Sequence, residues 1–171
     1  MKVFISYHRA DTKFKEKIVT ILKDVGISYY CVPPNANFDG WSHNEIADYI
    51  RQELLKCDIF LCIVGKDTYS RPHVDNEIHE ALKGAVGKRK GIVAVMLENR
   101  LDNKNSINLE TFPIKLAQNI KYIVLEQFAS ISENIVKALN LAYENSKNKN
   151  IQTNHSNKVM PLRSGKYYGI N

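Results

Sequence analysis

Five short apolar runs, separated by segments with helical spacing, constrain the fold of this 171-residue chain more than any other feature of its sequence. The runs are rich in β-branched and aromatic residues, and they lie at 2–7, 27–32, 58–64, 92–97 and 122–125. Apolar residues recur at helical spacing in 14–25, 46–54, 74–85 and 131–142. Strands that alternate with helices pair in parallel through right-handed crossovers. The sequence therefore predicts an α/β fold, with a doubly wound, five-stranded parallel sheet and helices on both faces.

Local signals mark the ends of the first two helices. Asp11 precedes the first helical stripe as a candidate N-cap, and Gly26 follows it where a C-cap glycine belongs. Ser42 and Glu45 have the spacing of a capping box, in which hydroxyl and carboxylate satisfy each other's backbone amides. After the fourth strand we expect a long loop at 98–106.

The composition is typical of one globular domain. Hydrophobic residues make up 44% of the chain and charged residues 25%, and no apolar run approaches the roughly 20 residues that span a bilayer. The N-terminus lacks the basic start and long apolar region of a signal peptide. We therefore predict a cytoplasmic protein without membrane contact, whose domain covers residues 1–146.

The net charge of +6 comes mainly from the end of the chain. Five basic residues lie there without any acid: Lys147, Lys149, Lys158, Arg163 and Lys166. The rest of the chain is close to balanced, which argues against nucleic-acid binding. Residues 147–171 also lack periodicity and are predicted to form a basic, mobile tail. The alternative is that their aromatic end, 166–169, docks onto the domain or a partner.

The cysteines and histidines do not predict a metal site. Cys31, Cys57 and Cys62 lie in or beside apolar segments without CxxC spacing, as expected for buried, reduced thiols. His73 and Glu77 are four residues apart and could face one side of a helix, but no third ligand has a suitable spacing.

Ligands of open parallel sheets bind beyond the carboxyl ends of the strands, near the point where the strand order reverses. That rule selects the loops at 6–11, 33–41 and 65–73. None of them carries a GxGxxG or GxxxxGK[ST] phosphate-binding motif, which argues against a Rossmann dehydrogenase and a P-loop enzyme.

The same loops carry a resemblance to the TIR domain family over roughly residues 1–145. The segment VFISYHRAD at 3–11 resembles the family's first box, and Gly40-Trp41 falls where its BB loop ends. The segment CDIFLCIVGKDTYSRPHVDNEI at 57–78 is similar to the family's apolar strand, small-residue loop, tyrosine and helix start. The resemblance implies a flavodoxin-like TIR fold and gives Glu77 the position of the catalytic glutamate of NAD-cleaving TIR domains. His73 stands where the family has tryptophan.

Within the family, the chain looks most similar to the TIR-like subunit of bacterial Thoeris antiphage systems. This resemblance implies that NAD is the substrate, with no further cofactor, and that the product is a cyclic or related ADP-ribose signal. A separate effector protein would sense that signal. Self-association with other TIR domains is a further implied partnership.

Glu77 can act alone in such a reaction because nicotinamide leaves NAD as a neutral molecule. Ordinary glycosidases need a second carboxyl group to protonate an oxygen leaving group. Glu77 would orient the ribose hydroxyls and stabilise the positive charge that grows on the ribosyl carbon. Without the resemblance, Glu77 is interpreted as a solvated acid near a helix N-terminus, where it complements the helix dipole.

Six further residues form the predicted substrate-binding set: Ser6, Tyr7, Arg9, Trp41, Tyr69 and His73. Arg9 has the fork of donors that suits a diphosphate, and Ser6 and Tyr7 would line the floor of the site. Trp41 either covers an aromatic ring of the substrate or anchors the core. Tyr69 belongs to the rim, and His73 has a hydrogen-bonding or capping role.

Two other functions fit these residues. Many TIR domains are adaptors that assemble with other TIR domains and do not cleave NAD. Nucleoside deoxyribosyltransferase-like enzymes pair a similar sheet with a glutamate that acts as a covalent nucleophile. A phosphoreceiver switch fits less well, because the third strand ends in Val64-Gly65 and not in an aspartate.

Overall fold

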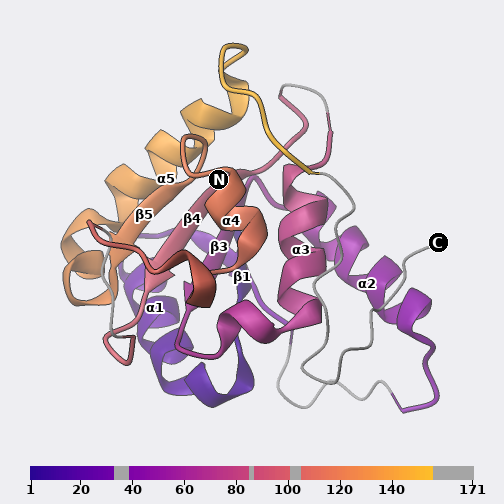
Figure 1. Ribbon diagram of the computed structural model, residues 1–171. Coiled ribbons are helices and arrows are strands. Elements are labelled where there is room, and N and C mark those ends of the chain that lie inside the picture. Colours follow the sequence, from indigo (N-terminus) through magenta and orange to yellow (C-terminus); the bar gives the residue numbers. More distant parts are fainter. Residues whose placement is uncertain (33–38, 85–86, 101–104, 156–171) are drawn as a thin grey trace.

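A five-stranded sheet forms the centre of the computed structural model, which describes residues 1–32, 39–84, 87–100 and 105–155 (Figure 1). The strands are β1 Lys2–Ser6, β2 Ser28–Tyr30, β3 Ile59–Val64, β4 Gly91–Met96 and β5 Val124–Gln127. All neighbouring strands pair in parallel, in the order β2-β1-β3-β4-β5. The predicted fold class is confirmed, and the strand order is that of flavodoxin-like sheets.

The strand order reverses between β1 and β3, which lie side by side although β2 comes between them in sequence. Ser6, the last residue of β1, pairs in register with Cys62 of β3. This pair therefore marks the switch point at which open α/β sheets bind their ligands.

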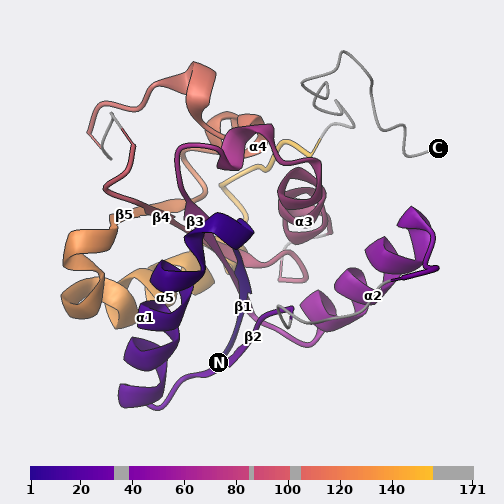
Figure 2. The ribbon, with the colours of Figure 1, turned by 90° about the horizontal axis from the view of Figure 1, so that it is seen from below.

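Helices cover both faces of the sheet (Figure 2). Because side chains alternate along a strand, Phe4, Phe60 and Cys62 face one layer, while Val3, Ile5 and Leu61 face the other. The first layer contains α2 His43–Leu55, α3 Pro72–Leu82 and α4 Ile114–Gln118. The second layer contains α1 Thr12–Asp24 and α5 Ile131–Lys147.

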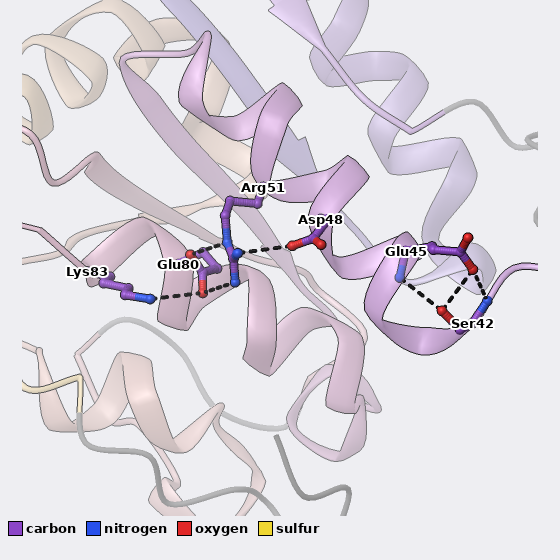
Figure 3. Close-up of polar contacts among 6 residues, drawn as sticks. All are labelled: Ser42, Glu45, Asp48, Arg51, Glu80 and Lys83. Carbon is purple, nitrogen blue, oxygen red and sulfur yellow. Dashed lines mark hydrogen bonds and ion pairs between the residues drawn. The ribbon is translucent and has the colours of Figure 1, made fainter. Parts of the chain in front are cut away.

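Two of the predicted helix-end signals are confirmed. The Glu45 carboxylate accepts hydrogen bonds from the backbone N–H of Ser42 at 2.7 Å, and the Ser42 hydroxyl accepts from the N–H of Glu45 at 3.3 Å (Figure 3). Gly26 has φ +69°, and Ile27 N–H donates to the Leu22 carbonyl at 2.8 Å, which closes α1.

The Asp11 prediction is wrong. Asp11 stands at the N-cap position of α1, but its side chain makes no capping hydrogen bond. Asp11 is buried instead, and its carboxyl group lies directly against Gly65. A Cβ atom placed on Gly65 would lie only 2.5 Å from Asp11 Oδ2, so a larger residue than glycine would clash with this carboxyl group. The carboxyl group therefore packs into the loop after β3 and does not satisfy a helix amide.

A charged contact joins α2 to α3. Arg51 donates from Nε to the Glu80 carboxylate at 3.0 Å and from Nη1 to Asp48 at 3.0 Å (Figure 3). Of the α2 side chains that the structure describes, only Leu54 is buried. The Arg51–Glu80 contact is therefore one of few specific links that hold α2 on the domain.

The short helix α4 was not predicted from the sequence. Its residue Lys115 donates to Asp75 of α3 at 2.8 Å, and each of the two side chains is only 4% exposed. Asn119, which follows the helix, is also buried. The segment between β4 and β5 thus completes the layer that contains α3.

The first part of the predicted mobile tail packs on the domain, which corrects the expectation for residues 148–155. We name residues 148–155 the strap (yellow after α5 in Figure 1). The buried Arg89 guanidinium donates to the carbonyls of Asn148 and Ile151, both at 2.6 Å. Asn119 and Asn154 exchange two hydrogen bonds of 2.7 Å. The rest of the predicted tail, 156–171, lies outside the described residues.

The three cysteines are free thiols. Cys57 and Cys62 are buried, as predicted, whereas Cys31 is only half-buried. Across the described parts of the chain, no helix is long and apolar enough to cross a membrane.

Candidate active site at the carboxyl ends of β1 and β3

Glu77 is buried, which contradicts its interpretation as a solvated acid. Its helix, α3, begins with Pro72, a residue suited to a position whose amide has no partner within the helix. Val74, Ile78 and Ala81 then form the apolar stripe that packs on the sheet. Glu77 lies beside this stripe and is only 9% exposed. The sequence thus places a carboxylate where an amphipathic helix meets the sheet.

The Glu77 carboxyl group lies near the Ser6–Cys62 pair of the switch point. Burial raises the pKa of the Cys62 thiol, the charge of Glu77 raises it further, and the Ser6 hydroxyl opposes both effects. Burial likewise raises the pKa of Glu77, to about 7, with the Ser6 hydroxyl again opposing. No positive charge among the described residues contributes to lowering the pKa of Glu77. The cluster is therefore a dry site with a single acid that is half ionised near neutral pH.

The chemistry open to this cluster follows from its polar atoms. Ser6 is 2% exposed, and its hydroxyl lies close enough to Glu77 and Cys62 to lower the pKa of both, although it forms no well-aligned hydrogen bond within the described residues. Buried polar atoms are seldom left unsatisfied, so this hydroxyl can bind a ligand group. Cys62 stays protonated because its pKa is raised, so it is no nucleophile. Glu77 is left as the group able to stabilise positive charge or to exchange a proton.

Tyr7 and Arg9 differ from Ser6 in their surroundings. Tyr7 follows Ser6 and so turns to the opposite layer, where it packs with the α1 cluster and Lys15 Nζ lies 5.5 Å from its ring centre. Arg9 is exposed in the short 3-10 helix Arg9–Asp11. The structure thus keeps Ser6 at the site and directs Tyr7 away from it.

The other predicted binding residues lie around α2 and α3. Trp41 is 45% exposed and contacts the Tyr49 ring of α2 edge-on, with the ring centres 6.0 Å apart, so it is not a core anchor. Tyr69 is half-buried in the 3-10 turn Thr68–Ser70, and His73 is exposed on α3 one turn before Glu77. Most of the 33–41 loop, at 33–38, lies outside the described residues.

Two polar residues of the segment after β3, Thr68 and Arg71, lie outside the predicted binding set. Thr68 is buried, and its hydroxyl accepts from the Gly65 N–H at 2.9 Å and donates to the Ile63 carbonyl at 3.4 Å, which fixes the loop after β3. Arg71 follows this loop and has a buried Nε atom. The Arg-Pro pair before a helix is the sequence signal that could have identified Arg71.

Within the described residues, no group of three or more histidine, cysteine, aspartate or glutamate side chains is arranged to hold a metal ion. His73 and Glu77, the pair considered from the sequence, differ in burial: the first is exposed and the second is buried.

Comparisons with known proteins identify the family. The TIR domain family profile matches residues 3–139, a span that includes Ser6 and Glu77. A search of curated proteins found no match. Among solved structures, the chain is similar to the TIR domains of the activated Roq1 resistosome recognising the pathogen effector XopQ, with 14% identity and a TM-score of 0.47. That alignment covers 85% of this chain and 81% of the other. Because the family profile spans most of the chain, this protein belongs to the TIR domain family.

Proposed function

We propose that this TIR domain cleaves the bond between nicotinamide and ribose in NAD, with Glu77 as the catalytic residue. TIR domains include both NAD-cleaving enzymes and adaptors, so the family leaves the choice open. The observation that favours catalysis is the burial of Glu77 beside the Ser6 hydroxyl at the switch point of the sheet. Burial that raises the pKa of a carboxyl group to about 7 destabilises the folded protein at neutral pH. Such groups are found most often at functional sites.

The reaction needs one negative charge in the right place. The bond between the ribosyl carbon and the nicotinamide nitrogen breaks, and its electron pair returns to the ring, so nicotinamide leaves uncharged. The positive charge that grows on the ribosyl carbon is stabilised by the ionised Glu77 carboxylate in a site of low dielectric constant. Ser6 donates a hydrogen bond to a ribose hydroxyl. Water, or a nucleophilic atom of the ADP-ribose itself, then adds to the carbon and loses a proton.

The product and its use form the finer part of the proposal. The resemblance of the loop at 64–74 to the Thoeris TIR-like subunit favours a cyclic ADP-ribose isomer that activates a separate effector in antiphage defence. NAD is then a substrate and not a cofactor. Mass analysis of the products made from NAD, with and without extract of infected cells, tests this part separately from nicotinamide release.

The test of catalysis compares wild type with Glu77→Gln. Glutamine keeps the size of the side chain and removes its charge, so we expect a folded protein that releases no nicotinamide from NAD. Glu133→Gln is the matched control, because Glu133 is exposed on α5 in the opposite layer. Activity of Glu77→Gln within a few fold of wild type would rule out the assignment.

The adaptor function is the second candidate, and one observation favours it. Trp41 ends the 33–41 loop with 45% of its surface exposed, as a residue that binds another protein would. An adaptor would assemble with other TIR domains and leave NAD intact. A wild-type protein that forms oligomers but releases no nicotinamide supports this function. A ribosyl adduct trapped on Glu77 from a nucleoside, without NAD cleavage, supports a deoxyribosyltransferase-like enzyme instead.

A further inference from the structure

Arg71 is held at the carboxyl end of β3 by its backbone. Its N–H donates to the Thr68 carbonyl at 3.2 Å, and its own carbonyl accepts from the Asp75 N–H at 3.1 Å in the first turn of α3. Thr68 is itself tied to Gly65. The start of the Arg71 side chain is therefore fixed between the loop after β3 and the N-terminus of the helix that carries Glu77.

The Arg71 side chain is unsatisfied. Its Nε atom is buried, and neither this atom nor the rest of the guanidinium forms a hydrogen bond or an ion pair within the described parts of the chain. Buried side-chain atoms without a partner number three in those parts, and two of them, Ser6 Oγ and Arg71 Nε, belong to residues at the switch-point end of the sheet. Arg71 as a whole is half-buried, and its buried Nε donor, which has no acceptor, is available to a ligand group.

The charge of Arg71 reaches across the switch point to residues that follow β1. Burial lowers the pKa of His8, and the Arg71 charge lowers it further. Burial raises the pKa of Asp11, which Arg71 opposes together with His8. The Asp11 carboxyl group packs against Gly65. Arg71 thus lies close enough to the residues after β1 for its charge to act on them.

We propose that Arg71 binds the phosphate groups of the ligand at this crevice, and that it, rather than Arg9, provides the main anion contact. The planar guanidinium matches phosphate oxygens with two parallel hydrogen bonds. The N-terminus of α3, an 11-residue helix, adds its partial positive charge at the same place. The inference rests on the proposed function, in which the phosphate-bearing ligand is NAD or the ADP-ribose made from it.

The test is calorimetric binding of ADP-ribose, which requires no turnover. Arg71→Gln should weaken the affinity roughly ten- to a hundredfold, the size of a lost hydrogen bond to a charged group, and should make binding less dependent on salt concentration. Arg71→Lys should recover part of the loss, because a point charge replaces the planar fork. Lys137→Gln, at an exposed lysine of α5 in the opposite layer, is the control and should bind like wild type, and Arg9→Gln should lose less affinity than Arg71→Gln.

Each outcome separates the two proposals. ADP-ribose binding that depends on Arg71, in a protein that releases no nicotinamide from NAD, supports the Arg71 site and overturns catalysis. Nicotinamide release with unchanged ADP-ribose affinity in Arg71→Gln overturns the Arg71 site alone. A loss of affinity in Arg9→Gln as large as that in Arg71→Gln, or absence of ADP-ribose binding by wild type, also overturns it. Circular dichroism of Arg71→Gln checks folding, and the partial recovery in Arg71→Lys distinguishes a lost phosphate contact from a structural defect.

Discussion

Lys115 of α4 and Asp75 of α3 form an ion pair that is almost completely buried, with the Lys115 Nζ 2.8 Å from Asp75 Oδ2. Burying either charge alone would carry a large desolvation penalty, and the attraction between the two charges offsets this penalty. Burial raises the pKa of Asp75, and the hydrogen bond from Lys115 opposes this increase.

Replacing Lys115 by methionine should destabilise the fold strongly, because it leaves the Asp75 charge buried without compensation. We expect a loss of about 3 to 5 kcal/mol in the free energy of unfolding at pH 8. The loss should be smaller at pH 5, because the pKa of Asp75 rises further without Lys115 and the variant then binds a proton that neutralises this carboxyl group. Urea denaturation at both pH values measures the effect, and Lys121→Met, at an exposed lysine, is the control. A loss below 1 kcal/mol at pH 8 would contradict the prediction.

Glu77→Gln should raise the stability of the protein at alkaline pH while it abolishes activity. The pKa of Glu77 is about 7 in the folded protein against an ordinary value of 4.5, so the folded state holds its proton longer than the unfolded chain. Wild-type stability therefore falls as the pH rises from about 4.5 to 7, by about 3 kcal/mol in total. Glutamine is neutral throughout, so the variant escapes this loss. Its thermal midpoint should exceed that of wild type by roughly 6 to 12 °C at pH 8 and match it near pH 4.5. Equal midpoints at pH 8 would show that Glu77 is solvated.

Nicotinamide release should depend on pH through the ionisation of Glu77. The charged carboxylate is the active form, so kcat should rise as the pH passes about 7 and level off above it. Ser6→Ala removes the hydroxyl that lowers the pKa of Glu77, so the rise should move to higher pH. Measured pH profiles of kcat for both proteins test this. A Ser6→Ala profile shifted to lower pH, or unshifted with unchanged kcat, would contradict the proposed role of the hydroxyl.

Removing the strap should destabilise the domain. A chain ending at Lys147 leaves two of the carbonyl partners of the buried Arg89 guanidinium missing and exposes the surface on which Ile151 packs. We expect a loss of about 2 to 4 kcal/mol, seen as a thermal midpoint roughly 5 to 15 °C lower. A chain ending at His155 keeps the strap and is the matched control. If the two truncated chains melt together, the strap contacts do not contribute to stability.

The sequence predicts the parts of the fold that repeat a pattern. All five strands and the helices α1, α2, α3 and α5 follow from apolar periodicity. The alternation along β1 puts Ser6 and Tyr7 on opposite layers, so the prediction that both line the floor of the site holds for Ser6 alone. The three-residue β2 is shorter than its apolar run at 27–32, because only part of that run pairs with β1. Glu77 could be placed on its helix, but its burial depends on how α3 packs on the sheet.

The features that escaped prediction depend on contacts between distant residues. α4 is five residues long, too short for a helical stripe to be recognised, and its Lys115 looks like a surface residue until Asp75 lies beside it. Nothing in the sequence around Arg89 or Ile151 indicates that they meet. The sequence marks Arg71 only through the proline that follows it and begins α3. That its Nε atom is buried without a partner depends on how the chain folds around it.

The contact between Arg89 and Ile151 closes a loop of 62 residues that contains β4, α4, β5 and α5. It therefore acts as a reversible counterpart of a covalent cross-link between the start of β4 and the chain after α5. Closing a loop of this length costs conformational entropy, which is offset only once the rest of the domain has folded. The strap should therefore dock late in folding and detach in local unfolding before the sheet opens. Its amides should exchange with solvent faster than those of β3 and β4, while the sheet and Glu77 remain in place.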